Sequence, residues 1–188
     1  NSFVHLAYHL KPQIIISHSG WNDIFYGLYL NKSFLDIGFI YNKDLEHLTS
    51  IIYDSKNIFN FFDNDQVDIY QDWDPENSLL LINGLIKKID VFKSIVSSSN
   101  SEFIYGLQGY NKNYIGKKAS FPNFFRTIHD THTELLKELK NSNINYINFQ
   151  EINNIEFIDS VHSTQESVEY ISDTYFNYIL ANFSDKFN

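Results

Sequence analysis

A buried strand that ends in a tight turn is predicted by one stretch near the N-terminus, Gln13-Ile14-Ile15-Ile16-Ser17-His18-Ser19-Gly20-Trp21-Asn22-Asp23. The continuous isoleucine run favours a strand that is covered on both faces, as in a parallel sheet. We expect the strand over residues 13–17 and the turn over 18–23. A helix over residues 2–10 should end at Lys11-Pro12, because the residue before a proline is displaced from the α region.

The rest of the chain alternates between helical and strand patterns. Apolar spacing predicts helices over 79–96 and 123–140 and strands over 102–107 and 144–149. The capping-box pattern Ser163-Thr164-Gln165-Glu166 predicts the start of a last helix. The expected inner-face residues are Leu79, Ile82, Leu85, Ile86, Ile89, Phe92 and Val96, then Phe125, Ile128, Leu135, Leu136 and Leu139, then Val168, Ile171, Tyr175, Tyr178 and Ile179.

This order of elements indicates an α/β fold with a parallel sheet and helices on both faces. In such sheets the functional site lies at the C-terminal ends of the strands. Residues 31–77 mix aromatic and acidic side chains, and we interpret them as an irregular insertion into a single domain that spans residues 1–188.

The composition excludes several classes of protein. The 188 residues are 43% hydrophobic and 20% charged, which is typical of one globular domain. A net charge of −9 argues against a nucleic-acid partner, since phosphate binding needs a concentrated basic surface. No cysteine is present, so disulfides and thiolate metal sites are excluded, and no apolar run approaches the roughly 20 residues of a membrane span.

A carboxylate and an imidazole stand three residues apart in Asp159-Ser160-Val161-His162, just before the last helix. On a turn that opens into a helix, both side chains can lie in one cleft, where Asp159 would hold the ring and His162 would handle protons. An imidazole has an ordinary pKa of about 6.5 and can accept a hydroxyl proton near neutral pH. Asn22, at the end of the first strand, could donate its side-chain N–H to an oxyanion. Together these residues suggest acyl-transfer chemistry.

In this order and spacing the two motifs resemble those of the SGNH (GDSL-type) hydrolases. Gly20-x-Asn22-Asp23 after an apolar strand is similar to the family's third block, and Asp159-x-x-His162 before a capped helix is similar to its fifth. The resemblance covers most of the chain apart from residues 31–77. It implies a three-layer α/β/α, flavodoxin-like fold and a serine esterase or O-acyltransferase that acts on a small acyl ester, with an acylated carbohydrate as the first substrate to expect.

The same resemblance assigns the site residues. His162 would be the general base and Asp159 the acid that orients it. Asn22 and Gly20 would form the oxyanion site, Asn22 through its side chain and Gly20 by shaping the turn. No cofactor and no metal are implied.

One part of the family pattern is missing. The residues before Gly20 contain neither the Gly-Asp-Ser nucleophile block nor a second-block glycine, and Ser17 and Ser19 fall on the third-block turn. Two N-terminal strands would also be missing, which would leave the 13–17 strand as an apolar sheet edge. Since position 1 is Asn1 rather than Met, we expect a fragment of a longer parent and an inactive isolated chain. The nucleophile would lie outside this chain, in the same parent or in a separate polypeptide, and a signal peptide there would leave the compartment open.

The alternative function is a non-catalytic module that keeps the SGNH fold, has lost the nucleophile and uses the cleft for binding. Two residues of the first turn also have structural interpretations. Asp23 would cap the following helix, and Trp21 would serve either in packing or as a wall of the substrate cleft.

Two further patterns suggest metal sites only weakly. His129 and His132 could share a metal ion on one helical face, but two solvated histidines are the favoured interpretation. Asp63-Asn64-Asp65 begins like a calcium loop, yet Asp68 stands at the sixth position, where such loops need glycine. We therefore interpret that segment as a solvated acidic loop.

Overall fold

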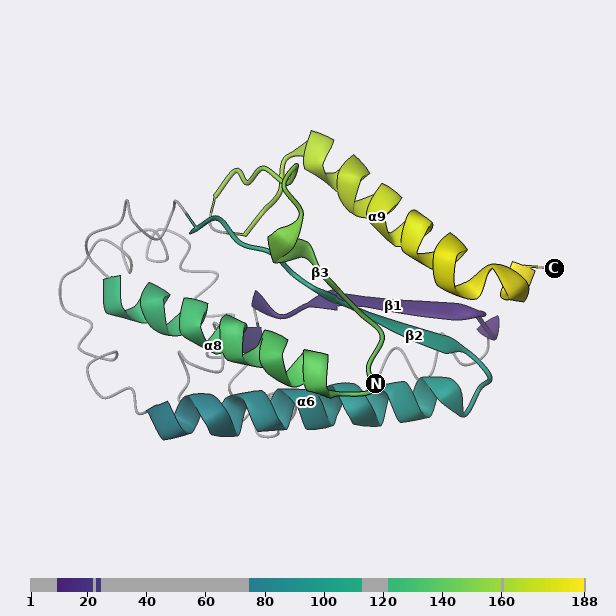
Figure 1. The fold of residues 1–188 in the computed structure, drawn as a ribbon, viewed down its shortest axis with the longest axis horizontal. Helices are drawn as coiled ribbons and strands as arrows, with labels where there is room; N and C mark the ends of the chain where they lie inside the picture. Colours follow the sequence, from purple (N-terminus) through teal and green to yellow (C-terminus); the bar gives the residue numbers. More distant parts are fainter. Residues whose placement is uncertain (1–9, 22, 25–74, 113–121, 160, 188) are drawn as a thin grey trace, which may run out of the picture.

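A computed structural model describes residues 10–21, 23–24, 75–112, 122–159 and 161–187 (Figure 1). The elements in chain order are β1 (Ile14–Ser19), α6 (Pro75–Ser97), β2 (Glu102–Leu107), α8 (Pro122–Asn141), β3 (Tyr146–Asn148), the 3₁₀ helix η2 (Phe149–Glu151), α9 (Gln165–Phe183) and the 3₁₀ helix η3 (Ser184–Phe187).

The three strands form one parallel sheet in the order β1-β2-β3. Ile14 pairs with Glu102 at one end of the β1–β2 ladder and Ser19 with Leu107 at the other. The prediction of a mixed α/β fold with a parallel sheet is confirmed. All three strands end at the same edge of the sheet because they are parallel.

Strand boundaries differ from the predicted ones for local reasons. The first strand continues to Ser19, whose carbonyl accepts a hydrogen bond from the Gln108 N–H at 2.9 Å. The third strand stops at Asn148, since the Asn148 side chain accepts from the Gln150 N–H at 3.1 Å and caps η2. A side-chain cap therefore competes with the strand ladder at this position.

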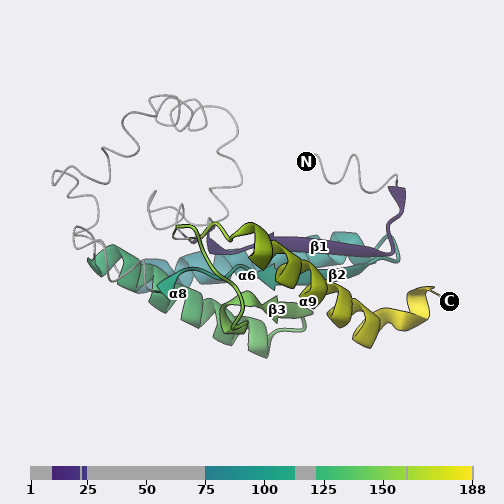
Figure 2. The same ribbon diagram turned by 90° about the horizontal axis from the view of Figure 1, so that it is seen from above.

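Helices cover both faces of this sheet (Figures 1 and 2). Helices α6 and α8 lie on the face to which Phe103, Tyr105 and Leu107 of β2 point, and these side chains belong to the larger buried cluster. Helix α9 covers the opposite face, where Ile104 belongs to a second cluster with Phe149, Tyr175 and Phe183. Because side chains alternate along β2, the strand contributes to one buried cluster on each face of the sheet.

The inner faces of α6 and α8 largely follow the predicted helical spacing. Buried residues are Ile82, Leu85, Ile89 and Val96 in α6 and Ile128, Leu135 and Leu139 in α8. Leu79 is 57% exposed, so its predicted core position is wrong, and Leu81 is buried instead. Full burial of each such side chain contributes about 1.5–3 kcal/mol to folding.

Helix α9 begins one residue later than the capping-box pattern implied. Its N-cap is Thr164 rather than Ser163, and the Thr164 hydroxyl accepts from the Ser167 N–H at 3.2 Å. Val168 is 44% exposed, contrary to the prediction, whereas Tyr175 is buried as predicted. The N-cap pattern is therefore Thr164-x-x-Ser167.

Several predictions fall outside the described residues: the helix over 2–10 apart from its last residue, most of the insertion over 31–77 and the acidic loop at Asp63-Asn64-Asp65. Residues 75–77, assigned to the insertion from the sequence, belong to α6. Among the described helices, none combines the length and the apolar character that crossing a membrane requires.

Candidate functional site

The carboxylate and the imidazole of the Asp159–His162 turn are in direct contact. Oδ2 of Asp159 lies 2.7 Å from Nδ1 of His162. The other carboxylate oxygen, Oδ1, accepts main-chain N–H bonds from Val161 at 2.9 Å and His162 at 2.8 Å. One oxygen thus shapes the backbone turn while the other holds the ring, and only the contact with the ring was expected from the sequence. Ser160 lies outside the described residues.

The base of this turn is closed by backbone hydrogen bonds. Phe157 and Ser163 form an antiparallel bridge, and the Ile158 N–H donates to the His162 carbonyl at 2.7 Å. Below them the Thr164 N–H donates to the Glu156 carbonyl at 3.0 Å. The turn is therefore a small closed loop that leads directly into α9.

One residue of the turn anchors it to the rest of the molecule. Val161 is 7% exposed and belongs to the buried cluster that includes Trp21 and Tyr110. The neighbouring side chain of His162 is 77% exposed, and that of Asp159 is 43% exposed. Because Trp21 follows the C-terminal end of β1 and Tyr110 follows that of β2, Val161 ties the turn to the edge of the sheet where parallel α/β folds bind ligands.

The hydrogen bonds of Asp159 also set its charge state. Partial burial raises the pKa of the Asp159 carboxyl, but the N–H groups of Val161 and His162 and the His162 ring outweigh it, and the net pKa lies below its ordinary value. Asp159 is thus a carboxylate at neutral pH. The carboxylate can accept a hydrogen bond from a protonated Nδ1 of His162. The lone pair on Nε2 is then available to take up a proton from a reacting group.

The turn after β1 depends on a glycine. Gly20 has φ +130°, which L side chains rarely adopt, and an added Cβ would lie 2.7 Å from Cδ1 of Leu107. The turn therefore favours glycine at this position, through its positive φ and its close approach to the Leu107 side chain. Asn22, the predicted oxyanion donor, lies outside the described residues.

Two interpretations of neighbouring residues are resolved. Trp21, Asp23 and Ile24 are helical, and the Ile24 N–H donates to the Gly20 carbonyl at 2.9 Å. Asp23 therefore lies inside the first helical turn, and its interpretation as the cap is wrong. Trp21 is 3% exposed and stacks on Tyr110 with ring centroids 4.9 Å apart, which makes it a packing residue.

A buried polar cluster beside this stack was not predicted. His132 is 2% exposed and its Nε2 lies 3.0 Å from the Gln108 carbonyl oxygen, so the interpretation of a solvated His132 is wrong. Burial, the largest cause, lowers the pKa of His132 to about 4. Tyr110 hydrogen-bonds Nδ1 of His129 through its hydroxyl, and burial raises the pKa of Tyr110 to about 12.

The position of His132 was visible in the sequence. It stands four residues after Ile128 and three before Leu135, on the buried face of α8. Within the part of the chain that the structure describes, no group of three or more His, Cys, Asp or Glu side chains is placed to hold a metal ion.

Comparison with known proteins gives no relative from which a function could be transferred. No protein-family model, no curated protein and no solved structure matches the chain.

Proposed function

We propose that this chain supplies the acid–base pair of an SGNH-type serine ester hydrolase or O-acyltransferase that acts on a small acyl ester, with an acylated carbohydrate as the first substrate to test. The observation that carries the proposal is the 2.7 Å contact between Asp159 Oδ2 and His162 Nδ1, two side chains that are both exposed. A carboxylate that orients an exposed imidazole is the arrangement that acyl-transfer enzymes use to activate a hydroxyl nucleophile.

In the proposed reaction His162 acts through Nε2. This atom takes the proton of a serine hydroxyl as the oxygen attacks the ester carbonyl, and the Asp159 carboxylate stabilises the imidazolium that forms. His162 then returns the proton to the leaving alcohol. The acyl group passes to water in a hydrolase or to a sugar hydroxyl in a transferase. The attacking serine belongs, in this proposal, to polypeptide outside this chain.

The oxyanion of the tetrahedral intermediate would be held near the end of β1. Asn22 would donate its side-chain N–H, and Gly20 would shape the turn. A donor of this kind is typically worth about 3–4 kcal/mol of barrier. Support for a shared cleft comes from Val161, which packs in the same cluster as Trp21, the residue next to Asn22.

The proposal also includes the finer architecture. The parallel order β1-β2-β3 and the helices on both faces are compatible with the three-layer, flavodoxin-like fold of SGNH hydrolases, in which further strands would precede β1. The non-catalytic binding module remains the competing function, and activity measurements separate the two.

The test uses the natural polypeptide that contains these residues. It should take up a fluorophosphonate label and hydrolyse p-nitrophenyl acetate, and His162→Ala should lower the hydrolysis rate by roughly 10²–10⁴-fold. Glu169→Gln, an exposed change in α9, is the matched control and should leave the rate unchanged. A natural protein that takes up no label and cleaves no ester would favour the binding module instead.

A further inference from the structure

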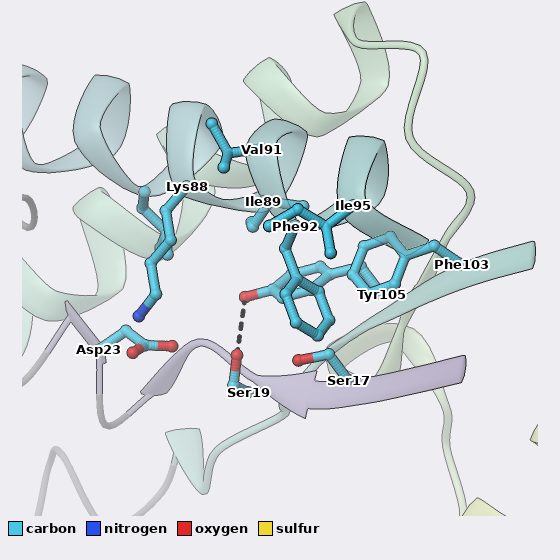
Figure 3. Close-up of a pocket in the computed structure, with 11 residues that line it drawn as sticks. Ser17, Ser19, Asp23, Lys88, Ile89, Val91, Phe92, Ile95, Phe103 and Tyr105 are labelled. Atoms are coloured by element: carbon cyan, nitrogen blue, oxygen red, sulfur yellow. Dashed lines mark hydrogen bonds between the residues drawn. The ribbon is translucent and has the colours of Figure 1, made fainter. Parts of the chain in front are cut away.

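A cavity lies between β1 and α6, on the face of the sheet that α6 covers (Figure 3). Its volume of about 400 Å³ falls within the range of roughly 300–1,000 Å³ that small-molecule sites occupy. Its walls come from the start of the helix after β1, from β1 and β2, and from one side of α6. The Asp159–His162 turn does not line it.

The lining of the cavity is mostly polar at one end and mostly apolar at the other. Ser19, Asp23 and Lys88 gather at the end nearest the C-terminus of β1 (Figure 3). The Ser19 hydroxyl donates to the Tyr105 hydroxyl at 3.4 Å, which adds a fourth polar group to this end. At the opposite end the walls are mainly aromatic and aliphatic, formed by Phe92, Ile95 and Phe103, with the Ser17 hydroxyl on the same side.

The apolar end is partly open to solvent. Ile95 is 38% exposed and Val91 is 54% exposed, although both line the cavity. Binding of a hydrocarbon group to such an apolar surface is favourable, because it removes apolar area from contact with water. Pockets that combine apolar walls with a few convergent polar groups are where small ligands bind.

The polar end carries opposite charges. The amine of Lys88 is directed toward Asp23 (Figure 3). Burial lowers the pKa of Lys88, and the Asp23 carboxylate partly offsets that effect. A charged head group would meet one attractive and one repulsive partner here. A hydroxyl, by contrast, can accept from the amine and donate to the carboxylate.

We propose that this cavity binds a small amphipathic molecule, with an uncharged hydroxyl-bearing head group at Asp23 and Lys88 and a medium-length hydrocarbon chain against Phe92, Ile95 and Phe103. An added polypeptide strand beside β1 is the competing occupant. The segregation of polar and apolar walls favours a single amphiphile, because a strand would place alternate side chains on both faces of the sheet. The proposal does not use the Asp159–His162 pair, which does not line the cavity.

Primary alcohols from 1-butanol to 1-decanol are suitable probes, titrated calorimetrically into the natural polypeptide. Affinity should rise about fourfold with each added methylene until the cavity is filled. Decanoate and decylammonium should bind more weakly than 1-decanol. Failure of every alcohol to bind, as expected if polypeptide already fills the cavity, or affinity that does not depend on chain length, would overturn the proposal.

Substitutions locate the binding site. Ile95→Glu should weaken 1-decanol binding by roughly tenfold or more, because the hydrocarbon chain of the alcohol would then contact a carboxylate. Leu80→Glu, at a 59% exposed position of α6 outside the cavity, is the control and should bind like the unsubstituted protein. Circular dichroism and thermal unfolding establish that both variants fold. His162→Ala should bind 1-decanol like the unsubstituted protein. Weaker binding in that variant would place the alcohol at the Asp159–His162 turn and would refute its assignment to the cavity between β1 and α6.

Discussion

The Asp159 carboxylate binds His162 twice, through Oδ2 to ring Nδ1 at 2.7 Å and through Oδ1 to the main-chain N–H at 2.8 Å. A single side chain thereby fixes both the backbone turn and the orientation of the imidazole. The ring remains 77% exposed despite these bonds. An exposed ring that is held in one orientation is what proton transfer by His162 would require.

Asp159→Asn tests the orienting role. An amide would present N–H groups or a neutral oxygen to Nδ1, which removes the charge that stabilises the imidazolium and disfavours the productive tautomer. We expect hydrolysis by the natural polypeptide to fall by roughly 10⁴-fold with little change in fold. Steady-state kinetics with p-nitrophenyl acetate measures the effect. Asp173→Asn, at an exposed position of α9, should have no effect, and an unchanged rate in Asp159→Asn would contradict the proposed mechanism.

Stability should depend on pH through His132. The pKa of this buried ring is about 4 in the folded chain and about 6.5 when unfolded, so below pH 6.5 the unfolded chain binds the proton that the folded chain does not. The stability that uncharged His132 contributes is therefore fully present above pH 6.5. It is lost as the pH falls toward 4, and the loss amounts to at most about 3 kcal/mol.

Urea unfolding between pH 7.5 and 4.5 measures this loss. Comparison with His132→Gln isolates the contribution of the histidine, since other groups titrate in both proteins. The variant should be less stable at pH 7.5 and should lose less stability on acidification. Parallel pH profiles for the two proteins would show that His132 is not the responsible group.

The α9 face offers a test of packing that does not depend on function. A Cβ added at Gly106 would lie 1.7 Å from the Tyr175 hydroxyl oxygen and 2.9 Å from Nδ1 of His18. These two side chains are themselves hydrogen-bonded at 2.7 Å across the glycine. Gly106→Ala should therefore displace α9 and destabilise the chain by roughly 1–3 kcal/mol, as overpacking does.

A double-mutant cycle makes the prediction specific. Tyr175→Phe removes the hydroxyl that the new methyl would strike, so the double variant should recover part of the loss caused by Gly106→Ala. Chemical unfolding of the four proteins gives the coupling energy. Strictly additive losses would mean that the methyl is accommodated elsewhere.

The parts that could be predicted from the sequence are those that short-range patterns determine. The alternation of strand and helix patterns was sufficient to predict the parallel sheet. The three-residue spacing of Asp159 and His162 was sufficient to predict that their side chains are in contact. The inner face of α8 followed the apolar spacing, but His132, which lies on that face between Ile128 and Leu135, was wrongly interpreted as solvated. Each of these depends on residues within a few positions of one another.

The features that were missed depend on contacts between distant segments. The Gln108 carbonyl that faces His132 is 24 residues away in the chain, and Gln150, which hydrogen-bonds the Tyr110 N–H and carbonyl, is 40 residues away. Strand ends also shifted where a side chain competed with the backbone, as at Asn148. No periodicity in a single sequence encodes such pairings.

Gly20→Ala tests the turn that would carry the oxyanion site. The substitution places a side chain at φ +130° and within 2.7 Å of Cδ1 of Leu107, so both backbone strain and a steric contact oppose it. We expect a loss of roughly 1–3 kcal/mol in the free energy of unfolding, measured by urea denaturation. Gly109→Ala is the matched comparison, since its Cβ would lie 3.0 Å from the Phe149 carbonyl oxygen without a left-handed backbone, and it should cost less. If Gly20→Ala were as stable as the unsubstituted protein, the turn after β1 would have to adopt a different backbone, and Asn22 would lose its predicted position beside the Asp159–His162 turn.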